Sequence, residues 1–214
     1  MNYWKQIYQR DYIDPFVSKS MGAIAEKIAE VCKVSKKTSI LDVGTGPGYL
    51  TFQLTKFSDN VTGLDNDSYI MKKNPVKKLQ IGDATNIPFD DGSFDLVICA
   101  NTLHHINKWK KAVSELKRVS RKYVVIWEPD SLNPCMLFCA LTRKDERLIL
   151  TRPLSLNAIK QELALKTPYV TNVSNYFFTN VLPDFILKYI PSVSFHKGLG
   201  TGFIIVGEHS TIKG

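Results

Sequence analysis

Apolar positions along the chain recur at two different spacings. Between Ser18 and Lys33 they return every three or four residues, which is the period of an α-helix with one buried face. Short runs of apolar and β-branched residues follow at five places: Ser39–Val43, Val61–Asp65, Leu79–Gly82, Phe94–Ala100 and Tyr123–Trp127. Helical or polar stretches separate these runs, and this alternation predicts a parallel sheet covered by helices.

Two of the separating stretches, Tyr49–Lys56 and Trp109–Val119, have a helical pattern of apolar residues. Further along the chain, the pattern predicts three helices at Asn133–Leu141, Leu156–Leu165 and Asp184–Ile190, and two late strands at Tyr169–Thr179 and Gly202–Gly207. Because no repeat or flexible linker interrupts the chain, we expect one doubly wound α/β domain with a helical insert at Pro129–Thr167.

The composition fits this expectation, and the sequence also predicts where in the cell the protein is found. The chain has 214 residues, of which 44% are hydrophobic and 22% charged, as in a globular domain with a sizeable core. No apolar stretch approaches the roughly 20 residues needed to span a bilayer, and residues 1–10 do not have the basic start and apolar run of a secretory signal. We therefore expect a cytoplasmic protein without a membrane span.

The four cysteines lie in apolar surroundings, at Cys32, Cys99, Cys135 and Cys139. They form no CxxC pair, and no histidine lies near Cys135 and Cys139 at the spacing of a zinc site. We expect buried free thiols and no bound metal. The formal net charge of +8 suits an anionic partner, but charge balance describes association and not fold.

The most informative motif runs from Ile40 to Tyr49, where a predicted strand enters a turn that contains Gly44, Gly46 and Gly48. Glycines at alternate positions allow a sharp turn and let a ligand approach the main chain. In a doubly wound sheet, such a turn places ligand-binding backbone at the carboxyl end of the strand. The following helix start favours a carboxylate or phosphate, and Asp42 is placed to offset an ammonium group.

Two further acids end the next two predicted strands. Asp65 lies 21 residues after Gly44, at a position suited to accepting both ribose hydroxyls, and Asp83 can accept from an adenine amino group while Ala84 supplies a backbone donor. The glycine spacing differs from the dinucleotide pattern G-x-G-x-x-G, and Tyr49 stands where a phosphate-binding loop needs lysine. These acids together favour an adenosine derivative as the ligand.

In these motifs the sequence resembles the class I S-adenosylmethionine-dependent methyltransferases, in the group that includes ubiquinone- and menaquinone-biosynthesis enzymes. The resemblance covers roughly Ser39 to Pro134 and includes the segments Leu41–Gly48, Gly63–Asp65, Gly82–Ala84, Phe89–Val97 and Asn101–Ile106. It implies a Rossmann-like fold with a mostly parallel seven-stranded sheet and S-adenosylmethionine as cofactor. The implied cofactor-binding residues are Asp42, Gly44, Thr45, Gly46, Gly48, Asp65, Asn66, Asp83, Ala84 and Asn101. The sequence departs from the family at Arg118–Lys122, where many members have a Pro-Gly-Gly turn.

A general base is needed in such an enzyme only when the acceptor keeps its proton, and histidine suits that role near neutral pH. The resemblance suggests His104 as the catalytic base, together with an aromatic hydroxyl from Tyr3, Tyr8 or Tyr12. The alternative is that His104 only shapes the cofactor pocket and that His105 contacts backbone at a helix start. Glu128 has two readings as well, because it can orient an acceptor or cap the next helix.

The resemblance divides the single domain into a helical N-terminal cap at 1–37, a cofactor-binding core at 38–128, an acceptor-site insert at 129–200 and a last strand with tail at 201–214. Aromatic residues in the insert favour a small, partly apolar acceptor (Phe138, Tyr176, Phe177, Phe178, Phe185 and Tyr189). Two other functions stay open. Basic residues around Trp109–Val119 suit an RNA methyltransferase, and a cofactor loop alone suits a non-catalytic protein that binds an adenosyl ligand. The sequence does not predict an oligomeric state.

Overall fold

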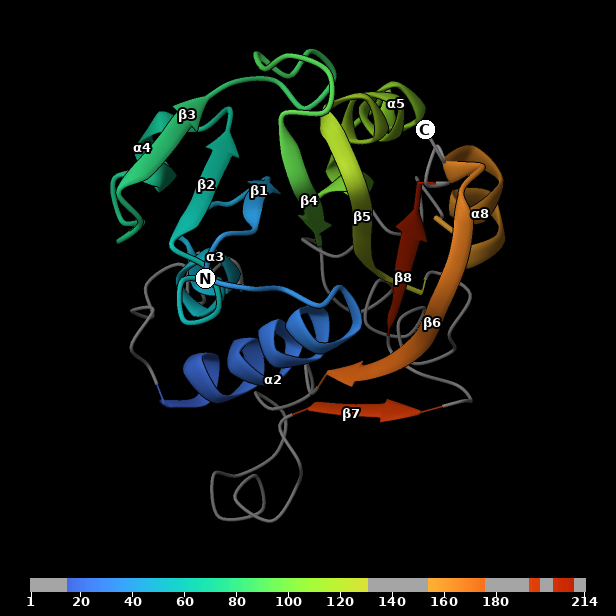
Figure 1. Cartoon of the computed structure of the whole chain (residues 1–214), viewed down its shortest axis with the longest axis horizontal. Helices are drawn as coiled ribbons and strands as arrows, with labels where there is room; N and C mark the ends of the chain where they lie inside the picture. Colours follow the sequence, from blue (N-terminus) through green and yellow to red (C-terminus); the bar gives the residue numbers. More distant parts are fainter. Residues whose placement is uncertain (1–14, 131–153, 176–192, 197–201, 210–214) are drawn as a thin grey trace, which may run out of the picture.

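The computed structural model of the chain describes residues 15–130, 154–175, 193–196 and 202–209. Within this part, the strands form one sheet in the order β3-β2-β1-β4-β5-β8-β6-β7 (Figure 1). Their bounds are β1 Ser39–Val43, β2 Asn60–Asp65, β3 Lys78–Ile81, β4 Phe94–Ala100, β5 Ser120–Pro129, β6 Lys166–Asn175, β7 Val193–His196 and β8 Gly202–Glu208. The pairs among β1 to β5 are parallel, and β8, β6 and β7 join in antiparallel pairs.

This arrangement confirms the doubly wound, mostly parallel sheet that the sequence predicts. All seven predicted strands are present, including the two late strands, which form β6 and β8. The edge strand β7 adds an eighth strand that the sequence analysis did not predict. With four residues, it is too short to show a period of its own.

Helices cover both faces of the sheet (Figure 1). On one face, α2 (Pro15–Val31) and α3 (Tyr49–Leu54) contribute to a core with Ile98 and Val125; on the other, α5 (Trp109–Val119) and α8 (Leu156–Leu163) contribute to a core with Val97 and Val124. Neighbouring residues of β4 thus enter opposite cores, because successive side chains in a strand point to opposite faces. A strand buried on both faces has the continuous apolar run that predicts it.

The predicted helices at Ser18–Lys33, Tyr49–Lys56, Trp109–Val119 and Leu156–Leu165 correspond to α2, α3, α5 and α8. The helices predicted at Asn133–Leu141 and Asp184–Ile190 lie outside the described residues. Two short elements were not predicted: α4 (Ser68–Met71) and the 3₁₀ turn η1 (Leu103–His105). Among the described helices, none combines the length and apolar character that crossing a membrane requires.

Candidate functional site

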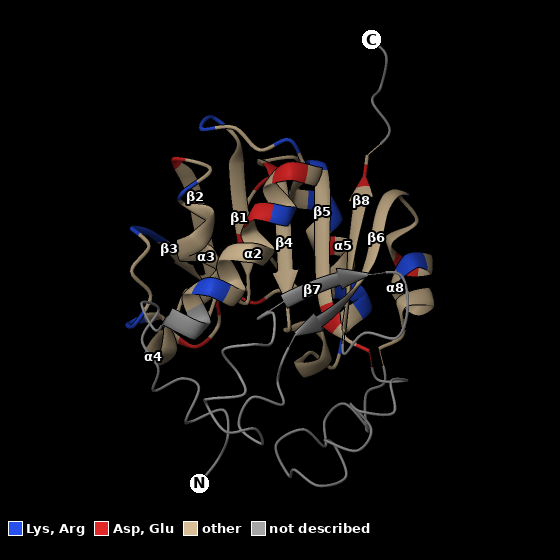
Figure 2. Cartoon of the chain, turned by 90° about the horizontal axis from the view of Figure 1, so that it is seen from below, with Lys and Arg blue, Asp and Glu red and all other residues tan. Residues whose placement is uncertain are grey.

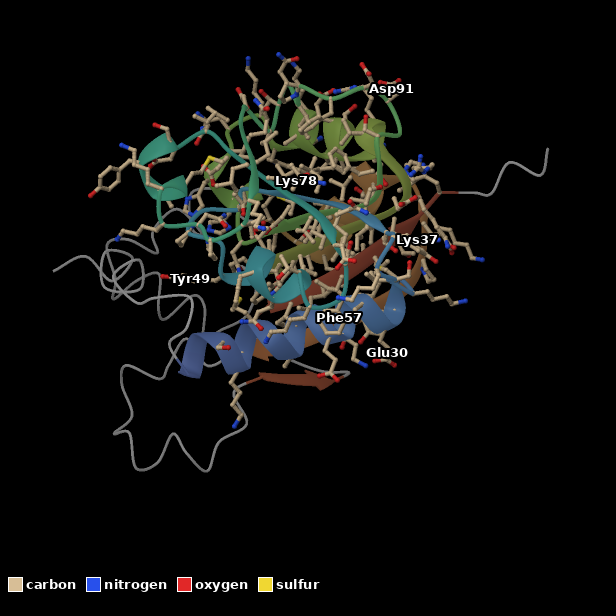
Figure 3. All side chains as sticks on the ribbon, turned by 60° about the vertical axis from the view of Figure 1, so that its left-hand side comes forward. Glu30, Lys37, Tyr49, Phe57, Lys78 and Asp91 are labelled. Carbon is tan, nitrogen blue, oxygen red and sulfur yellow. The ribbon has the colours of Figure 1, made fainter. Side chains whose placement is uncertain are left out.

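The predicted site residues gather at the carboxyl ends of the parallel strands. Because β1 pairs with β2 on one side and with β4 on the other, the chain reverses its direction of winding between β1 and β4. Open α/β sheets bind ligands at such a switch point. Figure 3 shows Tyr49, at the start of α3, on the side of the molecule opposite Lys37 and Asp91, which precede β1 and β4.

The three glycines of the turn after β1 differ in what surrounds them. All three have positive φ, at 78° for Gly44, 49° for Gly46 and 88° for Gly48. A Cβ atom at Gly44 would lie 2.2 Å from Oγ1 of Thr102, and one at Gly48 would lie 2.3 Å from Oδ1 of Asn74. At Gly46 the nearest side-chain atom would be 3.7 Å away, an ordinary contact. Gly44 and Gly48 therefore permit internal packing, whereas a Cβ atom at Gly46 would clash with no described atom.

Hydrogen bonds fix this turn against β2. The backbone N–H groups of Gly44 and Thr45 donate to the carbonyl oxygen of Leu64, at 2.7 and 3.1 Å. The N–H of Gly46 donates to Oδ2 of Asp65 at 2.8 Å, and the N–H of Asp67 donates to Oδ1 of Asp65 at 2.9 Å. Both carboxylate oxygens of Asp65 are thus held at the rim of the turn, where each can accept another hydrogen bond.

A chain of polar side chains runs beneath the turn. Asn74 donates to Oγ1 of Thr45 at 2.9 Å, the hydroxyl of Thr45 contacts that of Thr51, and the hydroxyl of Thr51 donates to Oδ2 of Asp42 at 2.5 Å. Asp42 is 3% exposed. Burial raises the pKa of Asp42 to about 6, with a contribution from the charge of Asp65 and against the effect of the Thr51 hydrogen bond. The ionised form of Asp42 is therefore costly and would gain from a nearby cation.

The third predicted acid, Asp83, lies two residues beyond β3. Asp83 is exposed, and its Oδ1 accepts from the N–H of Thr85 at 2.7 Å. Ala84 is half-buried beside it, and Asn66 is exposed next to Asp65. The structure thus places Asp42, Asp65 and Asp83 at or near the carboxyl ends of three neighbouring strands, in the order that the sequence analysis predicts.

Asn101 follows β4 with a φ of 50°, a left-handed conformation that is uncommon outside glycine. Its N–H donates to the carbonyl oxygen of Trp127 at 2.7 Å, which ties the end of β4 to β5. Non-glycine residues in this conformation cluster at functional sites, where surrounding structure holds them. The strained backbone of Asn101 is consistent with its predicted place in the site.

His104 lies in η1 and forms a buried pair with Glu128, near the end of β5. Nδ1 of His104 is 2.6 Å from Oε2 of Glu128, and the side chains are 6% and 0% exposed. The other oxygen of Glu128 accepts from the N–H groups of Thr102 and Leu103 at 2.9 and 2.8 Å. Glu128 therefore caps η1 within the described residues, while the next predicted helix lies outside them.

Sequence reasoning missed the contacts that join these residues. Thr51, Asn74 and Thr102 belong to no pattern in the chain, since each acts through a partner from a distant segment. The His104–Glu128 pair spans 24 residues, and the only available signal was that both follow the ends of strands that the sequence predicts to be neighbours. The predicted tyrosines Tyr3, Tyr8 and Tyr12 and the six aromatic residues of the acceptor insert lie outside the described residues.

Some of the basic side chains around α5 have acidic partners. Arg118 pairs with Glu115 and Asp91 at 2.8 Å, and Arg121 pairs with Asp95 at 2.7 Å. Basic and acidic segments are interspersed over the described ribbon (Figure 2). The described part of α5 and its flanks therefore does not present a uniformly positive face.

Cys32 and Cys99 are buried free thiols, as predicted, while Cys135 and Cys139 lie outside the described residues. Burial raises the pKa of the Cys99 thiol well above its usual range, and the charges of Glu128 and Asp42 add to this effect. Both carboxylates thus act on the same part of β4. Within the described ranges, no three His, Cys, Asp or Glu side chains are grouped to hold a metal ion.

The strand order, the glycine turn and the acids at successive strand ends define a nucleotide-type site on a Rossmann-like sheet. Residues 41–126 match the family model described as a methyltransferase domain. The predicted resemblance to methyltransferases is thereby confirmed.

Individual relatives match stretches of the chain of different lengths. The chain is 30% identical over 156 residues to an uncharacterized methyltransferase of Schizosaccharomyces pombe, which covers 61% of this chain and 55% of that protein. It is 34% identical over 86 residues to the demethylmenaquinone methyltransferase of Renibacterium salmoninarum, which covers 38% of this chain and 36% of that protein. The chain thus spans about half the length, or less, of these curated relatives.

The fold is similar to that of a solved S-adenosylmethionine-dependent methyltransferase from Archaeoglobus fulgidus. The TM-score is 0.61 at 16% sequence identity, and the match covers 88% of this chain and 94% of that one. This likeness shows that the two chains share the Rossmann-like methyltransferase fold.

Proposed function

We propose that this protein transfers a methyl group from S-adenosylmethionine to a small acceptor molecule. The observation that carries this proposal is the set of three carboxylates, Asp42, Asp65 and Asp83, at or near the carboxyl ends of neighbouring strands beside the glycine turn. The family of residues 41–126 supports it. When bound, the cofactor supplies an activated methyl group on a positively charged sulfur, which leaves as a neutral thioether.

The residues present fit this cofactor chemically. Its amino group, ribose hydroxyls and adenine amino group are all hydrogen-bond donors, and Asp42, Asp65 and Asp83 provide acceptors in the matching order. An ammonium group beside Asp42 would offset the cost of keeping this buried carboxylate ionised. The left-handed Asn101 lies at the next strand end, where we expect it to contact the methionine portion.

A small acceptor accounts for the described surface better than RNA does. Arg118 and Arg121, two of the basic residues that suggested a phosphate-binding face, already pair with acidic side chains. An RNA site needs positive groups that are available to phosphates and gives a steep dependence of affinity on salt. The partly apolar character of the acceptor remains a prediction from residues 129–200.

The first test measures thermal unfolding with S-adenosylmethionine, S-adenosylhomocysteine or NADH. A ligand at one hundred times its dissociation constant adds about 2.7 kcal/mol of stability, which is visible as a higher melting temperature. We expect both adenosyl-sulfur ligands to stabilise the protein and NADH to have no effect. Stabilisation by NADH alone would contradict the proposal.

A matched pair of variants locates the binding. Asp65→Ala should abolish the stabilisation, because it removes the acceptor at the rim of the turn. Asp67→Ala is the control: Asp67 caps α4 through the N–H groups of Tyr69 and Ile70, so its loss should lower the melting temperature but preserve the ligand-induced shift.

Transfer is then measured with labelled methyl groups in a metabolite extract and in total RNA at two salt concentrations. We expect label in small molecules. Incorporation into RNA that falls steeply with salt would favour the RNA alternative. Tight binding without any transfer, together with a stable stoichiometric partner, would favour the non-catalytic alternative.

A further inference from the structure

We propose that Glu128 is a positioning residue that fixes the ring of His104 in the form that accepts a proton from a hydroxyl-bearing acceptor. This inference rests on the proposed methyl transfer, and it deepens it by assigning the proton acceptor and the class of acceptor. It starts from the buried contact between Nδ1 of His104 and Oε2 of Glu128.

The position of Glu128 is fixed by three hydrogen bonds to one segment. Oε1 accepts from the backbone N–H groups of Thr102 and Leu103, and Oε2 contacts His104 two residues after Thr102. Since β4 and β5 are parallel neighbours, with Ala100 opposite Trp127, the two strand ends bring this segment and Glu128 together. The carboxylate therefore has little freedom to move away from the ring.

This contact determines which ring nitrogen is free. A carboxylate oxygen accepts hydrogen bonds, so Nδ1 of His104 carries the proton, as assigned from the hydrogen-bond network. In a neutral ring, Nε2 then has the lone pair and can accept a proton. Among the described residues, the side chain of His104 has Glu128 as its hydrogen-bond partner.

A purely structural role explains this arrangement poorly. Burying a carboxylate is costly unless its charge is compensated, and the described partners of Glu128 are two backbone N–H groups and a histidine. A neutral glutamine would cap η1 equally well through its carbonyl oxygen. What glutamate adds is the ability to accept from Nδ1 and to stabilise the ring when Nε2 also gains a proton.

Among the described residues, the titratable groups near His104 can be separated by experiment. His105 is exposed, and its ring lies 4.0 Å from the ring of His104, centre to centre. The buried Cys99 thiol on β4 and the Asp42 carboxylate on β1 belong to the same region, because the charges of Asp42 and Glu128 both raise the pKa of Cys99. Any titration assigned to His104 must therefore be compared with a variant that lacks His105.

The proposed proton transfer is balanced. The O–H bond of the acceptor breaks, its proton moves to Nε2 of His104, and the freed electron pair forms the bond to the methyl group as the bond from methyl to sulfur breaks. The protonated ring, held beside the Glu128 carboxylate, then releases its proton to water. An acceptor that reacts through an already unprotonated atom would need neither residue, so the pair points to an acceptor that reacts through a protonated group, and we assign a hydroxyl as that group.

The experiment begins with the nitrogen signals of the histidine rings in ¹⁵N-labelled protein without cofactor. In the unaltered protein we expect the neutral ring of His104 to be protonated at Nδ1. Glu128→Gln should reverse this, because its side-chain NH₂ would donate to Nδ1 and leave the proton on Nε2. His105→Gln is the control that assigns the signals and should leave the proton of His104 on Nδ1.

The second arm measures methyl transfer to a panel of phenols and alcohols. We expect Glu128→Gln and His104→Gln each to lower kcat at least tenfold, with cofactor affinity changed less than twofold. The double variant should lose no more than either single variant, since both residues act in one step.

The outcomes separate this inference from the proposed function. An unchanged His104 ring form in folded Glu128→Gln would overturn the positioning role, whatever the activity. Cofactor binding with no transfer to any hydroxyl compound would overturn the acceptor class. Failure of the cofactor to bind would refute the proposed function, while the ring signals would still show whether Glu128 controls His104.

Discussion

The two halves of the carboxyl edge of the sheet use their acidic residues in opposite ways. On the β1–β3 half, Asp65 and Asp83 lie at or near the surface and accept from backbone N–H groups, Asp65 from Gly46 and Asp67 and Asp83 from Thr85. On the β4–β5 half, Glu128 is fully buried and contacts His104. An accessible acid can bind a ligand directly, whereas a buried one acts through the residue it holds.

Asp42 lies at the boundary between these halves and shares features of both. It is buried like Glu128, yet it directly precedes the glycine turn and belongs to the row of acids that ends at Asp83. Its raised pKa means that ionising this carboxylate in the folded protein costs free energy. The difference between the halves suggests that binding and proton transfer can be disrupted separately.

The largest effect is expected from alanine at the first glycine of the turn. Gly44→Ala should lower the free energy of unfolding by more than about 3 kcal/mol, because it combines a positive φ with a Cβ atom pressed into Thr102, which joins the two halves. Urea denaturation measures this loss.

Gly46→Ala is the matched variant. It meets no close atom of the described protein, so we expect it to cost only about 1–2 kcal/mol for its φ while abolishing the stabilisation by S-adenosylmethionine. Equal losses of stability in the two variants would contradict the assignment of Gly46 to the ligand side.

Asp42→Asn should make the unliganded protein more stable at neutral pH. The folded-state pKa of about 6 exceeds the ordinary value of 3.8, so the folded protein holds this proton more readily than the unfolded chain. Stability is therefore lost as pH rises from about 4 to about 6, by about 2–3 kcal/mol in total. Asparagine avoids this loss and still accepts from Thr51.

Urea denaturation of Asp42→Asn and the unaltered protein at pH 7.5 and pH 4.5 checks this prediction. The difference in stability should be large at pH 7.5 and shrink at pH 4.5, while cofactor affinity falls. A variant that is less stable at both pH values would show that the Asp42 carboxylate has a compensating partner.

Asn74→Ala should cost about 1–2 kcal/mol and weaken cofactor binding without affecting the ring form of His104. Asn74 donates to Thr45 and to the carbonyl oxygen of Gly46, so its loss removes two hydrogen bonds that hold the glycine turn on the β1–β3 half of the edge. Thermal unfolding and cofactor titration measure both effects. Asn60→Ala, at the exposed start of β2, is the control and should leave both nearly unchanged.

The smallest change in stability is expected at Asn101. Asn101→Gly relieves the left-handed strain but adds flexibility to the unfolded chain, so the free energy of unfolding should change by less than about 1 kcal/mol. Its cofactor affinity should nevertheless fall, because the predicted side-chain contact is gone. Unchanged affinity would assign Asn101 a purely structural role.

The acids of the β1–β3 half could be predicted from the sequence because each belongs to a short local motif. Each acid lies at or near the end of a recognisable strand, and parallel strands bring their carboxyl ends to one edge. The same logic predicted the sheet, since buried parallel strands appear as continuous apolar runs. Elements of four residues, such as α4 and β7, escaped because they are shorter than the periods that reveal them.

The contacts of the β4–β5 half could not be predicted in the same way. The pairing of His104 with Glu128 depends on how far each strand extends and on the turn at Thr102, and neither is encoded by a local pattern. Asn74 is similar, because its partners Thr45 and Gly46 lie almost thirty residues away. Such residues become visible only when the fold is known.

Among the described residues, the buried thiols of Cys32 and Cys99 can report local opening of the protein. Alkylating reagents attack the thiolate, and burial raises the pKa of Cys32 to about 12 and that of Cys99 well above its usual range. Cys32 lies in the core beneath α2, and Cys99 lies in the core beneath α5. Alkylation rates measured separately for the Cys32 and Cys99 peptides would therefore report local opening of each helical layer, without any introduced label.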